Sequence, residues 1–153
     1  MKKLLSILMG IGLILILVGC SSEKTATFTQ KAGTTEFILV YTYDKKNDTV
    51  TKFKVEMKSS TENTRARKEN EKLSGEIKKD GVVVSVTEKD GKLISTVEID
   101  LTKNKFSKLK ESDNVFISGL IRNGYLAGDG DDALFSKSKE APIKQGFKEQ
   151  TKK

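Results

Sequence analysis

The sequence predicts an α+β fold: an antiparallel β-sheet with one longer and two short helices. Three observations indicate it. Apolar and polar residues alternate along most of the predicted strands, and turn-forming residues separate the strands of each hairpin. Between the third and fourth strands the apolar period changes to that of a charged helix. Three strands, a helix, two strands and then short helices are the order expected when helices gather on one face of a sheet.

The first three strands are predicted over residues 25–30, 35–43 and 49–58. The second carries apolar side chains on both of its faces, so we expect it to be central and covered on both sides. The third alternates, with Phe53, Val55 and Met57 on one face and Lys52, Lys54, Glu56 and Lys58 on the other. The sequence Lys-Lys-Asn-Asp at 45–48 predicts the hairpin turn that joins these two strands.

The remaining elements follow from changes of period and from turn residues. The longer helix is predicted over 62–77, and two further strands over 82–87 and 93–101 meet at Asp90-Gly91, a strong hairpin signal. Short helices are expected over 105–112 and 139–145; Pro142 lies in the first turn of the second one, and Gly146 ends it. Residues 114–121 (NVFISGLI) predict a strand and 123–132 a loop.

The N-terminal residues form an export signal. Lys2 and Lys3 precede an apolar run over 4–18, which is shorter than the roughly 20 residues that a spanning helix needs. The run ends in Leu17-Val18-Gly19-Cys20, which resembles a lipobox; such a signal is cleaved before a cysteine whose thiol carries diacylglycerol. An uncleaved anchor and an ordinary signal with an incidental cysteine are the alternatives. Cys20 is the only cysteine of the chain, which favours lipidation at this residue.

These signals divide the chain into four parts. Residues 1–19 are the cleaved lipoprotein signal peptide and 20–26 the lipidated N-terminus and tether. Residues 27–148 form a single α+β domain, and 149–153 are expected to be a disordered tail. We therefore expect a cell-membrane protein, anchored by lipid and facing outside the cytoplasm.

The composition excludes several kinds of chemistry. The chain has no histidine, which rules out Ser-His-Asp and Cys-His catalysis as well as histidine metal sites. Lipid on Cys20 would remove the only thiol. The formal net charge is +7, but lysines and acids are interspersed, and an exported domain is not expected to bind nucleic acid. We predict no catalytic, cofactor or metal site and no enzymatic activity.

An acidic segment over 128–132 suggests a calcium loop at first sight. Asp129, Asp131 and Glu140 occupy positions 1, 3 and 12 of the calcium-loop template. However, position 5 is Ala133, and Leu134 replaces the glycine that position 6 requires for the turn. The pattern therefore favours a solvated turn.

Two charged groups on the strands admit functional interpretations. Glu98 and Asp100 share a strand face, so they are either an acid–base pair or part of a cross-strand surface pairing. Lys52, Lys54 and Lys58 form a basic stripe, which either contacts anionic lipid or an acidic partner, or keeps the strand solvated. The surface interpretation is the commoner one for each group.

The ordered set of segments resembles the YehR-like family of small bacterial lipoproteins. The resemblance rests on the lipobox, Phe28, the strand over 36–43 with its charged turn and Val50-Thr51-Lys52, the charged helix, Val97-Glu98-Ile99-Asp100, residues 106–109, and Gln145-Gly146-Phe147-Lys148. The helix over 62–77 is shorter than the family implies, and the loop over 124–132 is unusual. The resemblance implies an α+β lipoprotein domain and carries over no catalytic residue.

Two hypotheses about function remain. The first is a non-catalytic module that is tethered to the membrane by lipid and binds an envelope protein, a polymer or a small ligand. The second is a cell-envelope enzyme that uses carboxylates or lysines. A deep pocket with converging polar groups would favour a small ligand or catalysis, whereas an exposed apolar patch would favour a protein partner.

Overall fold

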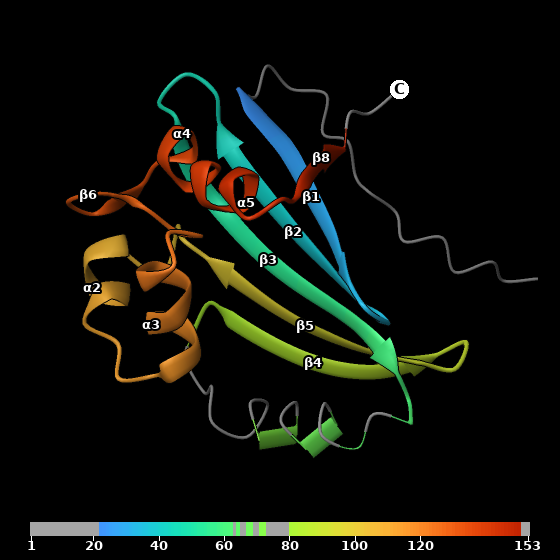
Figure 1. Ribbon diagram of the computed structural model, residues 1–153. Coiled ribbons are helices and arrows are strands. Elements are labelled where there is room, and N and C mark those ends of the chain that lie inside the picture. The colour runs from blue at the N-terminus through green and yellow to red at the C-terminus, as the bar shows by residue number, and fades with distance from the viewer. Residues whose placement is uncertain (1–21, 63, 65–66, 69–70, 73–79, 151–153) are drawn as a thin grey trace, which may run out of the picture.

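The computed structural model describes residues 22–62, 64, 67–68, 71–72 and 80–150 (Figure 1). The predicted signal peptide, Cys20 and most of the helix predicted over 62–77 lie outside these residues. The residues that are described between 64 and 72 are helical, and Arg67 forms an ion pair with Glu88 of the fourth strand.

Six antiparallel strands form one sheet in the order β4-β5-β3-β2-β1-β8. Their bounds are β1 (Glu23–Ala32), β2 (Thr35–Asp44), β3 (Thr49–Ser60), β4 (Val82–Lys89), β5 (Lys92–Asp100) and β8 (Lys148–Gln150). A separate two-stranded hairpin consists of β6 (Gly128–Asp129) and β7 (Asp132–Ala133). This hairpin interrupts the loop that was predicted over 123–132. The antiparallel α+β architecture is as predicted.

Both predicted hairpin turns contain left-handed residues. Asp48 has φ 57° in the β2–β3 turn, and Asp90 and Gly91 have φ 51° and 71° between β4 and β5. Aspartate and glycine reach this backbone region at little cost, which is why these short sequences specify their turns.

Four short helices cover one face of the sheet (Figure 1). They are α2 (Phe106–Lys110), α3 (Val115–Arg122), α4 (Phe135–Ser138) and α5 (Glu140–Lys144). Helices α2 and α5 correspond to the predicted short helices, and Gly146 follows α5 with φ 86°. Helix α4 was not predicted.

Helix α3 corrects the prediction of a strand over 114–121. The Asn114 side chain accepts hydrogen bonds from the N–H groups of Phe116 and Ile117, which caps the helix. Ile117 and Leu120, three residues apart, are its buried residues. A short apolar run fits a buried strand and a buried helix equally well, and here the cap and the helical spacing decide.

Both ends of the domain extend beyond their predicted limits. Strand β1 pairs with β2 from Glu23 onward and thus begins inside the segment 20–26 predicted as a tether. Strand β8 pairs with β1, placing Gln150 opposite Thr27, so Glu149 and Gln150 do not belong to a disordered tail. Residues 151–153 lie outside the described part of the chain. A sheet edge offers unpaired N–H and C=O groups, and β8 pairs with those of β1 over residues 27–29.

The core lies between the helices and one face of the sheet. Phe28, Tyr41 and Phe53 have no exposed surface, and Phe135 of α4 packs against Tyr41 with ring centroids 5.7 Å apart. The opposite face of β2 carries Ile38 and Val40, which are half-buried. In the described part of the chain no helix covers them, so the predicted cover on both sides of β2 is not found there.

Candidate interaction surfaces

Tyr41 links the sheet to the helical layer. Its ring lies 5.8 Å from Phe28 and 4.7 Å from Phe53 between centroids, and its hydroxyl donates to the carbonyl of Tyr125 at 2.8 Å. Burial, followed by the nearby Tyr125, raises the pKa of Tyr41 above the ordinary tyrosine value. Tyr41 is therefore a neutral structural donor rather than an acid–base group.

Lysines neutralise the carboxylates of the β6–β7 hairpin. Asp131 accepts from Lys105 Nζ at 2.6 Å and from Ser107 Oγ at 2.5 Å, and Asp129 pairs with Lys137. The hydrogen bonds from Lys105 and Ser107 hold the pKa of Asp131 below its usual value. Among the described residues, no cluster of three acidic, histidine or cysteine side chains is arranged to hold a metal ion. Asp129 and Asp131 are thus each paired with a lysine on the exposed surface.

The charged groups on β3 and β5 face one another across the sheet. The strand register places Lys52 opposite Asp100 and Lys54 opposite Glu98. On β3 itself, Glu56 lies 3.8 Å from Lys54 and 3.1 Å from Lys58. Glu98 and Asp100 therefore each face a lysine, and Lys54 and Lys58 each have an acidic neighbour. For Glu98 and Asp100 this register fits the cross-strand surface pairing, and the lysines of β3 have acidic neighbours on the same face of the sheet.

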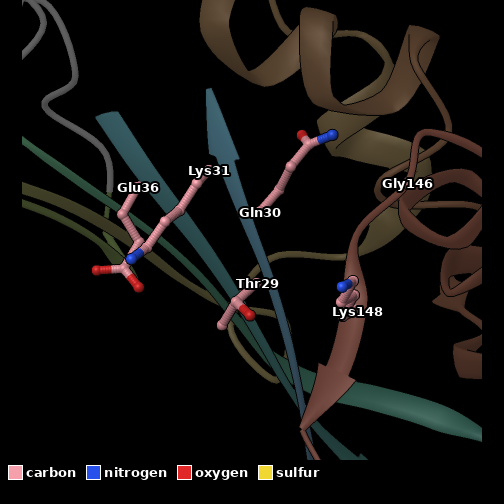
Figure 2. A pocket seen from close by; sticks show the side chains of 6 residues that line it. All are labelled: Thr29, Gln30, Lys31, Glu36, Gly146 and Lys148. Atoms are coloured by element: carbon pink, nitrogen blue, oxygen red, sulfur yellow. The ribbon is translucent and has the colours of Figure 1, made fainter. Parts of the chain in front are cut away.

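A polar hollow of about 440 Å³ lies at the edge of the sheet beside β1 and β8 (Figure 2). It is lined by Thr29, Gln30, Lys31, Glu36, Gly146 and Lys148. Gln30 turns toward the helical layer, where its Nε2 donates to the carbonyl of Gln145 at 2.7 Å. Lys31 and Glu36 are opposite one another in the β1–β2 register and point the same way in Figure 2. All the residues that line the hollow are exposed or half-buried.

Helix α3 presents an apolar groove to the surface. The groove, of about 240 Å³, is lined by Val115, Phe116, Gly119, Leu120, Asn123 and Tyr125. Val115 is 78% exposed although it is fully apolar. A Cβ added at Gly119 would meet no atom within 4 Å, so the glycine leaves the groove open without being required by packing. This is the exposed apolar patch that favours a protein partner.

The start of β1 is fastened to the β2–β3 turn and, through it, to α4. Lys45 N–H donates to the carbonyl of Ser22 at 2.8 Å. Hydrogen bonds from the Ser22 side chain and from the Lys46 N–H lower the pKa of Asp44. Asp48 accepts from the N–H and the hydroxyl of Ser136, at 3.1 Å from the N–H. We call these three parts, residues 22–24, residues 45–48 and α4, the anchor-end surface.

Cys20, the predicted lipidation residue, precedes Ser22 by two positions in the sequence and is outside the described residues. Within the described part of the chain, no helix combines the length and the apolar content needed to cross a bilayer.

Comparisons with known proteins show relatives along nearly the whole chain. An uncharacterised lipoprotein of Listeria innocua is 29% identical over 157 residues, which cover 97% of this chain and 96% of the relative. The NMR structure of YehR from E. coli superposes with a TM-score of 0.61 at 26% identity, over 86% of this chain and 93% of YehR. No protein-family model matches the chain.

A second solved structure, an NMR structure of a protein from Streptococcus pneumoniae, shares the fold. Its TM-score is 0.55 over 98% of both chains, at 15% identity. The α+β domain and the lipoprotein relative together define the chain as a small lipoprotein, which a lipid attaches to a membrane. Within that class, the similarity to YehR at 26% identity and the lipoprotein relative support the resemblance to the YehR-like family that the sequence indicates.

The two most suggestive surfaces were not identified from the sequence. The α3 groove was hidden because its residues were assigned to a strand. Asn114, followed directly by the apolar run that begins at Val115, was the available signal for a capped helix. Lys45 and Lys46 were interpreted only as turn residues, since their closeness to Ser22 depends on β1 pairing with β2.

Proposed function

We propose that the protein is a non-catalytic interaction module, held by lipid on Cys20 at the outer face of the cell membrane, that binds an envelope protein through the α3 groove. The observation that carries the proposal is the apolar groove around the exposed Val115. Complete burial of a valine side chain contributes roughly 1.5–3 kcal/mol, so a partner that covers the groove gains stability from it.

The arrangement of charges supports a non-catalytic role. An enzyme built without histidine or a free thiol would depend on carboxylates or lysines. The carboxylates that first suggested chemistry, Glu98, Asp100, Asp129 and Asp131, all lie opposite or beside lysines on exposed or half-buried surface. This pairing favours surface solvation over the split pKa values of an acid–base pair.

Photo-crosslinking in cells tests the binding surface. A benzophenone amino acid replaces Val115 in the full-length protein, and a matched variant carries it at Val83, a valine on β4 that is 63% exposed. We expect one discrete, repeatedly identified envelope protein to be crosslinked from position 115 and not from position 83. Equal labelling from both positions, or none from position 115, contradicts the proposal.

A groove-filling variant adds a direct test. Gly119→Glu places a charged side chain in the groove, and the surrounding space accommodates its Cβ. With the probe at position 115, we expect Gly119→Glu to abolish the crosslink, while Gly119→Ala retains it. A crosslink that survives Gly119→Glu rules out the groove as the contact surface.

A further inference from the structure

The length of chain between the attachment point and the fold restricts how the domain can sit on a membrane. Strand β1 begins at Glu23, and the carbonyl of Ser22 is already hydrogen-bonded to the β2–β3 turn. Only Ser21 separates Ser22 from Cys20. Two residues of extended chain span at most about 7 Å, so lipid on Cys20 holds Ser22 close to the headgroups.

The anchor-end surface moves with Ser22 because its three parts are bonded together. Asp48 holds α4 through Ser136, and its carbonyl accepts from the N–H of Phe135 at 2.8 Å. The ring of Phe135 stacks on Tyr43, with centroids 3.9 Å apart. Figure 1 shows the start of β1, the β2–β3 turn and α4 at the same end of the molecule. A short link at Ser22 therefore brings the turn and α4 to the bilayer as well.

The charges at this surface suit anionic headgroups. Lys24, Lys45 and Lys46 are exposed, and the ion pairs between described residues include none of them, although the charge of Lys46 also helps to lower the pKa of Asp44. Lys139, directly after α4, lies over the ring of Phe135 at 5.5 Å. Three acids also lie here, but their oxygens accept protein hydrogen bonds: Glu23 from Thr51, Asp44 from Lys46 N–H and Asp48 from Ser136. These donors are neutral and leave the carboxylates ionised, so the four lysines exceed the three acids by one positive charge, and the exposed ammonium groups of Lys24, Lys45 and Lys46 are the ones that reach an outside partner.

We propose that the anchor-end surface docks on anionic lipid headgroups, with Lys45 and Lys46 in contact with them, so that β1 points away from the bilayer. The inference rests on the proposed lipidation of Cys20. Lysines beside a membrane are attracted to its anionic lipids, and salt weakens the attraction. The orientation leaves the β1–β2 turn at the far end of a strand of ten residues, or about 33 Å from the anchor.

Short-range fluorescence quenching tests the orientation. The full-length lipidated protein is reconstituted into vesicles that contain phosphatidylglycerol and a lipid with a nitroxide near its headgroup. Lipid occupies the thiol of Cys20, so one introduced cysteine carries the fluorophore: Asn47→Cys in the β2–β3 turn, or Thr34→Cys in the β1–β2 turn as the control. Both positions are exposed. We expect at least threefold stronger quenching at position 47 than at position 34.

Lysine variants separate headgroup recognition from simple tethering. The ratio compared is the quenching at position 47 divided by the quenching at position 34. K45Q/K46Q should lower this ratio to the value found with purely zwitterionic vesicles. K52Q/K54Q, which changes the lysines of β3 that face β5, should leave the ratio unchanged. A ratio near one in anionic vesicles overturns the proposed orientation. A high ratio that neither lipid charge nor K45Q/K46Q alters overturns the recognition of anionic headgroups.

Flotation of the vesicles distinguishes the two proposals. Protein that floats with the vesicles and shows equal quenching at both positions keeps its lipid anchor, so only the docking fails. Protein that does not float, and whose Cys20 reacts with the fluorophore, lacks the anchor, and the docking inference fails with it.

Discussion

The two faces of the sheet use the same strands for different purposes. On the helix-bearing face, Tyr41 and Phe53 are fully buried. On the other face, Val40 is half-buried, and Lys54 lies opposite Glu98. Successive side chains of a strand point to opposite faces, so one strand can supply both. The difference indicates that burial on the covered face supplies most of the stability, whereas the charged side chains of the other face keep it solvated. Binding of a partner is therefore expected at the helices and at the strand ends.

Neighbouring alanine substitutions on β2 should show this difference most strongly. Tyr41→Ala removes a buried ring and its hydrogen bond to Tyr125, and we expect it to lower the free energy of unfolding by about 3–5 kcal/mol. Val40→Ala removes two half-buried methyl groups and should cost about 1 kcal/mol. Urea unfolding followed by circular dichroism measures both.

A Tyr41→Phe variant separates the ring from its hydroxyl. It should cost about 1–2 kcal/mol, because the carbonyl of Tyr125 loses its donor. Equal losses for Tyr41→Ala and Val40→Ala would show that the two faces contribute alike.

The helical layer depends on the cap of α3. Asn114→Ala removes an acceptor for two backbone N–H groups and should lower the free energy of unfolding by about 1 kcal/mol. Asn114→Asp keeps the acceptor and serves as the control. If alanine and aspartate destabilise the protein equally in thermal unfolding, the side chain does not act as a cap.

Asp131 of the β6–β7 hairpin should make the stability of the protein depend on pH. The hydrogen bonds that Asp131 accepts from Lys105 and Ser107 lower its pKa in the folded state. Ionised Asp131 therefore stabilises the fold at pH values above its pKa in the unfolded chain, about 3.9. This stabilisation is lost as the pH falls through the folded pKa. Asp131→Asn should therefore be less stable than the wild type at pH 7 and converge with it in acid.

Asp132→Asn is the matched control for this hairpin, because Asp132 makes no ion pair among the described residues and acts on Lys105 only as a more distant charge. The free energy of unfolding is measured at a series of pH values. The account is contradicted if Asp131→Asn lowers this free energy by the same amount at every pH, or if Asp131→Asn and Asp132→Asn have the same effect.

The smallest effect is expected on the exposed face. A double-mutant cycle of Lys54→Gln and Glu98→Gln should give a coupling of about 0.2–1 kcal/mol, and added salt should reduce it. A coupling of several kcal/mol would mean that this face is as strongly organised as the core.

Local chemistry explains which parts of the fold could be predicted from the sequence. The Asp90-Gly91 turn, the alternation of β3 and the end of α5 at Gly146 are properties of a few neighbouring residues. Residues 114–121 were misassigned because a run of apolar residues fits a buried strand and a buried helix alike. The Asn114 cap is a local signal for helix α3, whereas the burial of Ile117 and Leu120 depends on the tertiary surroundings of the helix.

The limits of the domain and its surfaces depend on pairing between distant residues. Residues 149 and 150 are polar and were interpreted as a tail, yet they complete the edge of β1, more than a hundred positions earlier in the chain. The same holds for Lys52 and Lys54, whose partners on β5 are fixed only by register. Lys45 and Lys46 gain their proposed role because β1 starts beside their turn.

Mass spectrometry of the mature protein purified from membranes tests the central claim, a domain anchored by lipid on Cys20. The account predicts an N-terminal peptide that begins at Cys20 and carries diacylglycerol, and its loss in Cys20→Ser, which should remain an unprocessed precursor. An N-terminal peptide that still contains residues 1–19, or one that begins elsewhere with Cys20 unmodified, would contradict the account.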